Sequence, residues 1–453
     1  MGHETISWSR IHGVKRPLPG AKSELSHIGY SVTSTSVIAP WSPTTIRHGA
    51  FVAALGGIAD AEIASSPRWQ ALCAGFTVLR LVDAWANDGA VDIRALRATT
   101  ATVGSLPGTS TVRELLNAIA TAVALPIAHA ERSPYTPLLA YGRLLEYDAE
   151  WALALDAYGV VIEHGPAGGA ADLLPEAYHR AGYCRRMLGD LSGAAADFAT
   201  GRKIAQEQGN TPADLQLRLS EANVIAHRGN FPAAARALEA LITDAAAAGA
   251  RQVVAAARHD WGLVAHAQHH FEHAALLCFA AAQSYDDPRQ RARALADLAA
   301  CSAALGHREL ARRANEIVYA TAATRELRWA AAINLLEMAV DERRETLFEA
   351  YRSSLEAEPL PVTLAANYHL FAGRGYARFG RSRLARQEFG RALGISMDAA
   401  LNQIGILADQ ALAELDAPII STRTEAASRE SWSPEIEHLT RSVAQLHLAT
   451  VEQ

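Results

Sequence analysis

The sequence has few aromatic residues and few cysteines, and it has no long apolar run. Aromatic residues make up 7% of the chain although 50% of it is hydrophobic; much of the difference is alanine, the strongest helix former. The 4 cysteines show no Cys-x-x-Cys spacing, which argues against a zinc or redox motif, so we expect buried thiols. Nowhere do about 18 uncharged apolar residues follow one another, as a membrane-spanning helix requires. Because no apolar secretory signal is present either, we expect a cytoplasmic protein that has no membrane partner.

Motifs that would indicate an enzyme are also missing. The chain contains no phosphate-binding loop of the GxxxxGK[ST] or GxGxxG type and no GxSxG nucleophile elbow. Asp286 and Asp287 precede Pro288 without a third aspartate at helical spacing, so we interpret them as a helix terminus. An enzyme built as a ring of helix pairs would need acidic residues gathered at helix starts, and the sequence has no such cluster. We therefore expect no enzymatic activity and no cofactor.

Charge gives little reason to expect nucleic acid as a partner. The formal net charge is −6, which does not favour binding to a polyanion. Residues 1–46 are locally basic and rich in Ser, Thr, Pro and Gly without helical periodicity, so we interpret them as a flexible, solvated arm. Neither end carries a helix-turn-helix pattern. We do not expect direct nucleic-acid binding.

Amphipathic helical patterns begin after the arm. They cover Phe51–Ile63, Trp69–Trp85, Ile93–Val103 and Val112–Leu125, and the turn-forming segments SSP, NDG and LPGTS separate them. We expect these helices to form two irregular pairs over residues 47–130.

An internal repeat is the strongest feature of the chain. Gly142, Ala154 and Tyr158 return 40 residues later as Gly182, Ala194 and Phe198. Further copies contain Ala222, Ala234 and Leu238; Gly262, Ala274 and Cys278; and Gly373, Ala385 and Phe389, while weaker units surround Ala299 and Asn334. This spacing predicts about seven helix pairs over residues 131–395.

The spacing has a physical meaning. A small residue in the middle of the first helix and another early in the second let two antiparallel helices approach closely. The large side chain one turn later fills the gap to the next pair, and a glycine between the helices adopts a positive φ. Because one pair cannot bury its apolar face alone, successive pairs must stack into a superhelix.

This pattern resembles the tetratricopeptide repeat (TPR) family. The Gly, Ala and aromatic positions of the first, second and last units carry the resemblance, which covers about residues 135–395. The 40-residue step exceeds the 34 residues usual in the family and is similar to the repeat regions of large bacterial transcriptional regulators. The resemblance implies an all-α superhelix, with the first helix of each pair lining a concave groove that binds a protein or peptide.

The C-terminal part predicts two further helices. Residues 396–416 are typical of a helix that caps the open end of a repeat array. Residues 417–453 contain a linker and then an amphipathic helix with a stripe of Ile436, Leu439, Val443 and Leu446. The stripe allows the last helix either to dock on the body or to pair with a partner.

The resemblance places a set of basic and aromatic side chains in the groove. They are Arg143, Tyr147, His179, Tyr183, Arg186, Asn223, His227, His259, His266, Arg374 and Arg378. Arginine and asparagine can hold the carboxylates and backbone of an extended peptide, so we expect an acidic peptide partner. The lysines of chaperone-binding members are missing, which argues against a chaperone tail. The set can also be read as solvated groove residues without a partner.

A histidine cluster is a weak candidate for a metal-binding site. His266 and His270 are four residues apart, the spacing at which two imidazoles share a helix face. The cluster spans a predicted turn, so its rings should point in different directions, and we expect no metal.

Two functions remain after these exclusions. We expect a non-enzymatic scaffold or adaptor that binds a peptide segment in the groove. The alternative is a regulatory sensor that binds a small ligand or signalling protein and relays this binding signal to the transcription machinery. The sequence indicates no oligomeric state.

Overall fold

The computed structural model of the chain describes residues 47–56, 66–108, 110–126, 133–416 and 432–451. In these ranges every regular element is a helix, which confirms the all-α prediction. The described residues form two compact units that divide between residues 233 and 234. Below they are called the N-terminal and C-terminal units. The arm predicted at residues 1–46 lies outside the described residues.

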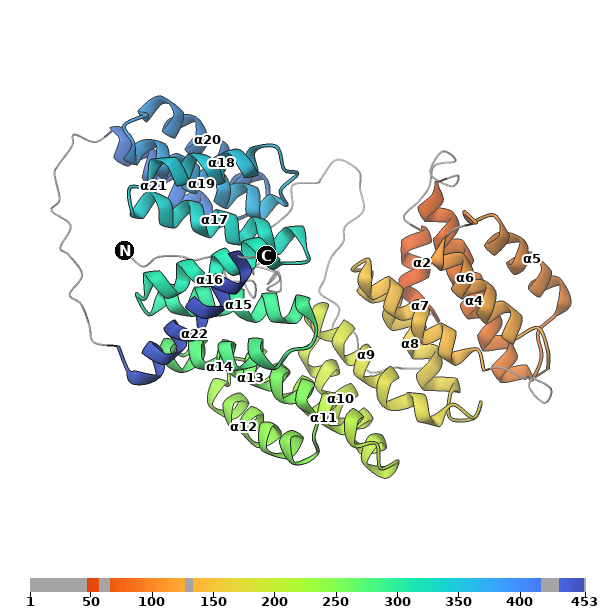
Figure 1. Cartoon of the computed structure of the whole chain (residues 1–453). Coiled ribbons are helices and arrows are strands. Elements are labelled where there is room, and N and C mark those ends of the chain that lie inside the picture. Colours follow the sequence, from red (N-terminus) through yellow and green to blue (C-terminus); the bar gives the residue numbers. More distant parts are fainter. Residues whose placement is uncertain (1–46, 57–65, 109, 127–132, 417–431, 452–453) are drawn as a thin grey trace. The chain divides into compact units, whose positions relative to one another are not determined.

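The N-terminal unit consists of consecutive helices that pack on their sequence neighbours (Figure 1). They are α2 (Gly49–Gly56), α4 (Pro67–Asp88), α5 (Ile93–Gly104), α6 (Thr111–Ala122), α7 (Tyr135–Tyr147), α8 (Trp151–His164), α9 (Leu174–Met187), α10 (Leu191–Glu207) and α11 (Thr211–His227). Ser66, Asp92, Asp190 and Asn210 cap helix starts by accepting hydrogen bonds from backbone N–H groups. The second half of the predicted helix 51–63 lies outside the described residues.

The C-terminal unit continues the same pattern. Its helices are α12 (Phe231–Ala247, which spans the division), α13 (Arg251–Ala267), α14 (Phe271–Ser284), α15 (Pro288–Ala304), α16 (Arg308–Thr321), α17 (Arg325–Asp341), α18 (Glu345–Glu356), α19 (Val362–Arg378), α20 (Ser382–Asp398), α21 (Asn402–Asp416) and α22 (Pro434–Val451). The repeat pairs run from α7/α8 to α19/α20. Helix α21 packs on α20 and α19 at the end of the stack. No helix of the described ranges has the length and apolarity needed to cross a membrane.

The small residues of the repeat allow close helix packing, as their spacing predicts. A Cβ added to Gly182 would lie 2.5 Å from the Phe198 ring, and one added to Gly373 would lie 2.5 Å from the Phe389 ring. Both distances are too short for real contacts, so only glycine lets the aromatic ring pack against the first helix. Gly189 and Gly229, at the turns within pairs, have φ of 86° and 81°.

One central pair replaces the aromatic side chain with an amide. Asn315 stands at the position that Phe198 and Phe389 fill in other units, and it is fully buried. Its Oδ1 accepts a hydrogen bond of 3.2 Å from Asn334 Nδ2 on α17, while its own Nδ2 donates to the backbone of Ala311. The buried polar groups are therefore paired, which explains how this unit tolerates a missing ring.

Candidate functional site

The predicted groove residues divide between the two units. Those of the N-terminal unit lie on α7, α9 and α11, the first helices of successive pairs, and α9 packs against both of the others. We call this surface the α9 face; it carries Arg143, Tyr147, His179, Tyr183, Arg186, Asn223 and His227. The remaining predicted residues belong to the C-terminal unit, on α13 and α19.

Arg186 is held in place by an aromatic ring and an imidazole. Its guanidinium lies over the ring of Tyr183, 5.1 Å from the centroid, and its Nη1 lies 3.3 Å from Nε2 of His227. His227 Nδ1 is 2.7 Å from the backbone oxygen of Asn223, which can only accept, so Nδ1 carries the proton. Nε2 of His227 is then the acceptor for Arg186. The arrangement orders the guanidinium without neutralising its charge.

Two further aromatic side chains lie on α7 and α8, the helices that precede α9. Trp151, at the start of α8, packs edge-on against Tyr183 with ring centroids 5.7 Å apart. Tyr147, the last residue of α7, is 83% exposed. A tyrosine so exposed and an ordered arginine on neighbouring helices are the residue types that anchor protein interfaces.

His179 has a different role from the one predicted. Its Nε2 lies 2.9 Å from Ser220 Oγ on α11, and its ring packs against Phe198. Burial lowers the pKa of His179 to about 4, with a further contribution from the charges of Arg180 and Arg186. The ring is therefore neutral near pH 7 and joins α9 to α11, so it adds no positive charge to the α9 face.

Carboxylates that the sequence interpretation overlooked neutralise part of the face. Glu176 forms an ion pair with Arg143. Glu146 accepts a hydrogen bond of 2.6 Å from Tyr158 and lies 3.3 Å from Arg180. The 12-residue separation of Glu146 and Tyr158 matches that of the repeat skeleton, which is the signal that could have revealed this contact. Within the described residues, the contacts of Arg186 are with Tyr183 and His227 and not with a carboxylate.

In the C-terminal unit, His259 belongs to the core and not to a groove. It is 3% exposed, and its Nε2 lies 3.0 Å from Asp297 Oδ2 while Nδ1 lies 3.4 Å from the Tyr285 hydroxyl. Burial between two polar partners removes it from the set available to a ligand. His266 is half-buried, with its ring edge-on to Phe271.

The two predicted arginines of α19 differ in their surroundings. Arg374 lies over the ring of Phe371, 5.3 Å from its centroid, and its Nη1 is 3.7 Å from Glu337 Oε1. Arg378, one turn later, is exposed. Arg374 repeats the arginine-on-aromatic arrangement of the α9 face, but with a carboxylate beside it.

The histidine pair does not form part of a larger ligand set in the described ranges. His266 lies in the last turn of α13, while His270 is the residue before α14, and His269 between them has a φ of 64°. No group of three or more His, Cys, Asp or Glu side chains suited to a metal occurs among the described residues.

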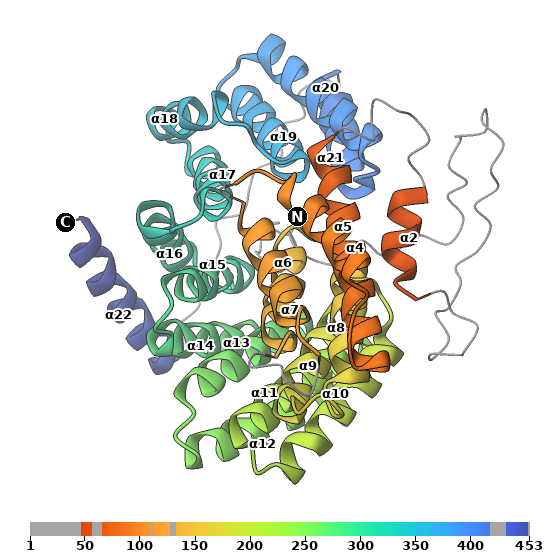
Figure 2. The same ribbon diagram turned by 90° about the vertical axis from the view of Figure 1, so that its right-hand side faces the viewer.

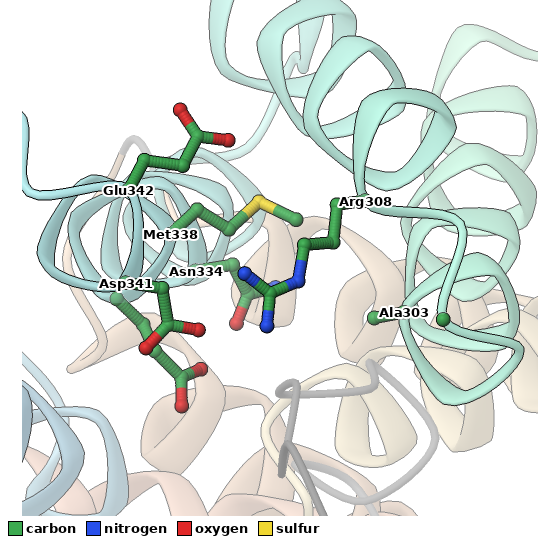
Figure 3. A pocket seen from close by; sticks show the side chains of 8 residues that line it. Ala303, Arg308, Asn334, Met338, Asp341 and Glu342 are labelled. Carbon is green, nitrogen blue, oxygen red and sulfur yellow. The ribbon is translucent and has the colours of Figure 1, made fainter. Parts of the chain in front are cut away.

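A small pocket opens between α17 and the turn that joins α15 to α16. Arg308 extends across it toward Asn334 and Asp341, with Met338 and Glu342 on the α17 side (Figure 3). Its volume is about 40 Å³, which suits ordered water and not an organic ligand. The lining comes from the two weaker repeat units around Ala299 and Asn334, and for that reason the sequence pattern did not indicate this pocket.

Comparisons with known proteins give similarities to solved structures alone. No family model matches the chain, and no curated protein matches it. Among similar solved structures is a tetratricopeptide repeat protein from Parabacteroides merdae ATCC 43184, with 13% identity and a TM-score of 0.41, covering 61% of this chain and 98% of that one. The APC/C hetero-tetramer Cut9-Hcn1 is another, with 15% identity and a TM-score of 0.41, covering 71% of this chain and 59% of that one. The chain's own stacked pairs, with glycine facing an aromatic ring, have the architecture of a TPR-like α-α solenoid.

Proposed function

We propose that this chain is a non-enzymatic interaction scaffold and that its α9 face binds an acidic or extended peptide segment of a protein partner. The observation that carries the proposal is the position of Arg186 over Tyr183 and beside His227. A guanidinium presents a planar fork of donors that matches a carboxylate. Because ring and imidazole already order this side chain, a peptide would lose less conformational entropy on binding it.

The neighbouring residues give the proposed site its selectivity. Arg143 and Arg180 are paired with Glu176 and Glu146, so Arg186 is the cation with the greatest remaining capacity for a carboxylate. Tyr147 offers an exposed ring to an apolar side chain of the same peptide. We therefore expect recognition of one carboxylate next to an apolar residue, and not of a long acidic run.

The test is a selection of short random peptides displayed on phage, made on the full-length chain. We expect enrichment of Asp or Glu next to an apolar residue, with binding that weakens as salt is raised. Arg186→Glu should weaken the selected peptides about tenfold or more, equivalent to about 1.4 kcal/mol. Arg80→Glu is the matched control, because Arg80 is exposed on α4, away from the α9 face.

The outcomes separate the hypotheses. Equal binding by wild type and Arg186→Glu would remove Arg186 from the site. If the library yields no enriched peptide, the scaffold proposal loses its peptide-binding face, and the regulatory-sensor alternative becomes the one to pursue. Arg374→Glu should be measured separately, because Glu337 already lies beside that arginine.

A further inference from the structure

The C-terminal helix α22 docks on two helices that are far from it in sequence. It packs against α16 and α14, the second helices of neighbouring pairs (Figures 1 and 2). Ile436, Leu439 and Val443 are 0%, 1% and 0% exposed and belong to one core cluster with residues of α14 and α16. Their spacing of three and four residues places them on one face of the helix. We call the surface that receives them the α14/α16 surface.

Ring stacking and polar contacts also hold α22 on the α14/α16 surface, in addition to its apolar side chains. Trp432 stacks on the ring of His307, with centroids 4.6 Å apart and an interplanar angle of 26°. His307 Nδ1 accepts from the backbone N–H of Leu310, so Nε2 carries the proton and donates to Thr440 Oγ1 at 3.1 Å. His447 Nε2 lies 2.9 Å from Glu316 Oε2 near the other end of α22. Contacts at both ends fix the register of the helix on this surface.

Helix α22 is not a simple continuation of the stack. In a repeat array each helix pair packs on its sequence neighbours, as α21 does on α20 and α19. Residues 417–433 join α21 to α22 in sequence. Helix α22, however, packs on earlier pairs of the same unit. Ser433, just before α22, contacts Glu272, which is 161 residues away in the sequence. The docking of α22 therefore resembles the binding of a tethered helix more than the folding of another repeat.

We propose that the α14/α16 surface is a helix-docking site that accepts α22 of a second copy of this chain, with the chain's own α22 as the competing tethered occupant. Every copy carries both the surface and the complementary helix, so exchange forms the same contacts between two chains that one chain forms alone. The tether favours the internal contact up to an effective concentration on the order of millimolar. Any change that prevents α22 from reaching its own surface should therefore produce a dimer with exchanged helices. This inference is independent of the α9 face, which lies in the other unit.

The first test combines two defective full-length copies. Leu439→Asp places a charge on the buried face of α22 and leaves the α14/α16 surface intact. Leu276→Asp places a charge on that surface at α14, where Leu276 is half-buried beside Glu435 of α22, and leaves α22 intact. We expect each variant to be a monomer alone and their mixture to form a 1:1 complex by light scattering after size-exclusion chromatography. A Leu276→Asp/Leu439→Asp double variant should form no complex with either.

Leu448→Asp provides the matched control for the helix. Leu448 lies on α22 but is 62% exposed, so its charge should leave docking unchanged, and a Leu276→Asp/Leu448→Asp copy should still pair with the Leu439→Asp copy. Absence of a mixed complex, with both copies retaining wild-type helix content, would overturn the proposal.

The second test does not depend on the Leu276 variant folding. Deleting residues 419–430 leaves five residues between α21 and α22, which reach at most about 17 Å. Neighbouring packed helices are about 8–10 Å apart, so this tether cannot pass from α21 back to α14. We expect the deletion variant to be a dimer in which α22 amides stay protected from hydrogen exchange. A monomer with unprotected α22 amides would show that a second copy's surface does not accept the helix.

Discussion

Arg186 donates a hydrogen bond to His227, and the direction of that bond is set by the backbone of α11. Because His227 Nδ1 donates to the carbonyl of Asn223, only its Nε2 is left to accept. The His227 ring therefore orders the Arg186 guanidinium as a hydrogen-bond acceptor.

The first prediction concerns this support. His227→Ala should leave the charge of Arg186 in place but free its side chain, so acidic peptides selected on the α9 face should bind about three- to tenfold more weakly through lost pre-organisation. Isothermal titration calorimetry measures the change, with a less favourable binding entropy expected. His438→Ala is the control, because His438 is exposed on α22. Unchanged affinity would mean that Arg186 does not need the imidazole.

The second prediction tests the repeat skeleton. Gly182→Ala should destabilise the chain by about 1–3 kcal/mol, because the new Cβ would lie 2.5 Å from the Phe198 ring. Gly390→Ala, within α20, should instead stabilise it by up to about 1 kcal/mol, because a Cβ there meets nothing within 4 Å. Chemical denaturation of both variants measures the difference. Equal effects would show that Phe198 can move aside.

The third prediction concerns stability between neutral and mildly acidic pH. Burial lowers the pKa of His179 to about 4, whereas in the unfolded chain it is near 6.5. As pH falls from about 6.5 to 4, the unfolded chain binds a proton that the folded chain does not, so stability decreases through this window. At pH 5 the loss attributable to His179 should be about 2 kcal/mol relative to pH 7. His179→Gln keeps a hydrogen-bonding group for Ser220 and should lose correspondingly less; identical pH profiles would contradict the shift.

The fourth prediction concerns a buried carboxylate in the N-terminal unit. Asp83 accepts hydrogen bonds from His48 and His164, at 2.8 and 3.1 Å, and lies 3.1 Å from Arg47. Burial would raise its pKa, but these hydrogen bonds and the charges of His48 and Arg47 together lower the pKa well below the usual range. The ionised form therefore stabilises the fold above about pH 4, and this contribution is lost as pH falls further.

Asp83→Asn tests that relationship. Removing the charge should cost about 3 kcal/mol at pH 7, because Arg47 loses its counter-ion and one of the two acceptor oxygens shared by the histidines becomes an NH2 donor. As pH falls below about 4, the difference in stability between the variant and the wild type should narrow progressively, since the contribution of ionised Asp83 is lost as its carboxylate is protonated. Urea denaturation of the variant and the wild type, at pH 7 and below about pH 4, measures the difference in unfolding free energy at each pH. A pH-independent gap would indicate a packing effect and not an electrostatic one.

The helices and their pairing were predictable because the forces involved are local. Gly182 and Phe198, sixteen residues apart, belong to one helix pair, so their contact follows from a fixed spacing along the chain. Turn glycines such as Gly189 and caps such as Asp190 act within a few residues of their own position. The same locality explains why the weaker unit was harder to interpret: Asn315 and Asn334 replace a ring with a hydrogen bond between two pairs.

The candidate site was predictable only in part. The sequence placed Arg186 and Tyr183 on one helix surface, where the structure brings them together. It did not reveal that Glu176 pairs with Arg143, because that contact joins consecutive first helices whose separation depends on how the pairs stack. His259 was misplaced for the same reason: Asp297, which buries its ring, lies on the next pair.

By itself, the sequence determined the all-α class, the 40-residue period and the helical stripe of the last segment, because each follows from the spacing of small, apolar and turn-forming residues. Only the tertiary structure decided which arginines keep a free charge and where α22 docks. These outcomes depend on contacts between side chains that lie 33 to 161 residues apart, such as Glu176 with Arg143 and Ser433 with Glu272. Such contacts arise from the stacking of whole helix pairs, and no local pattern encodes that geometry.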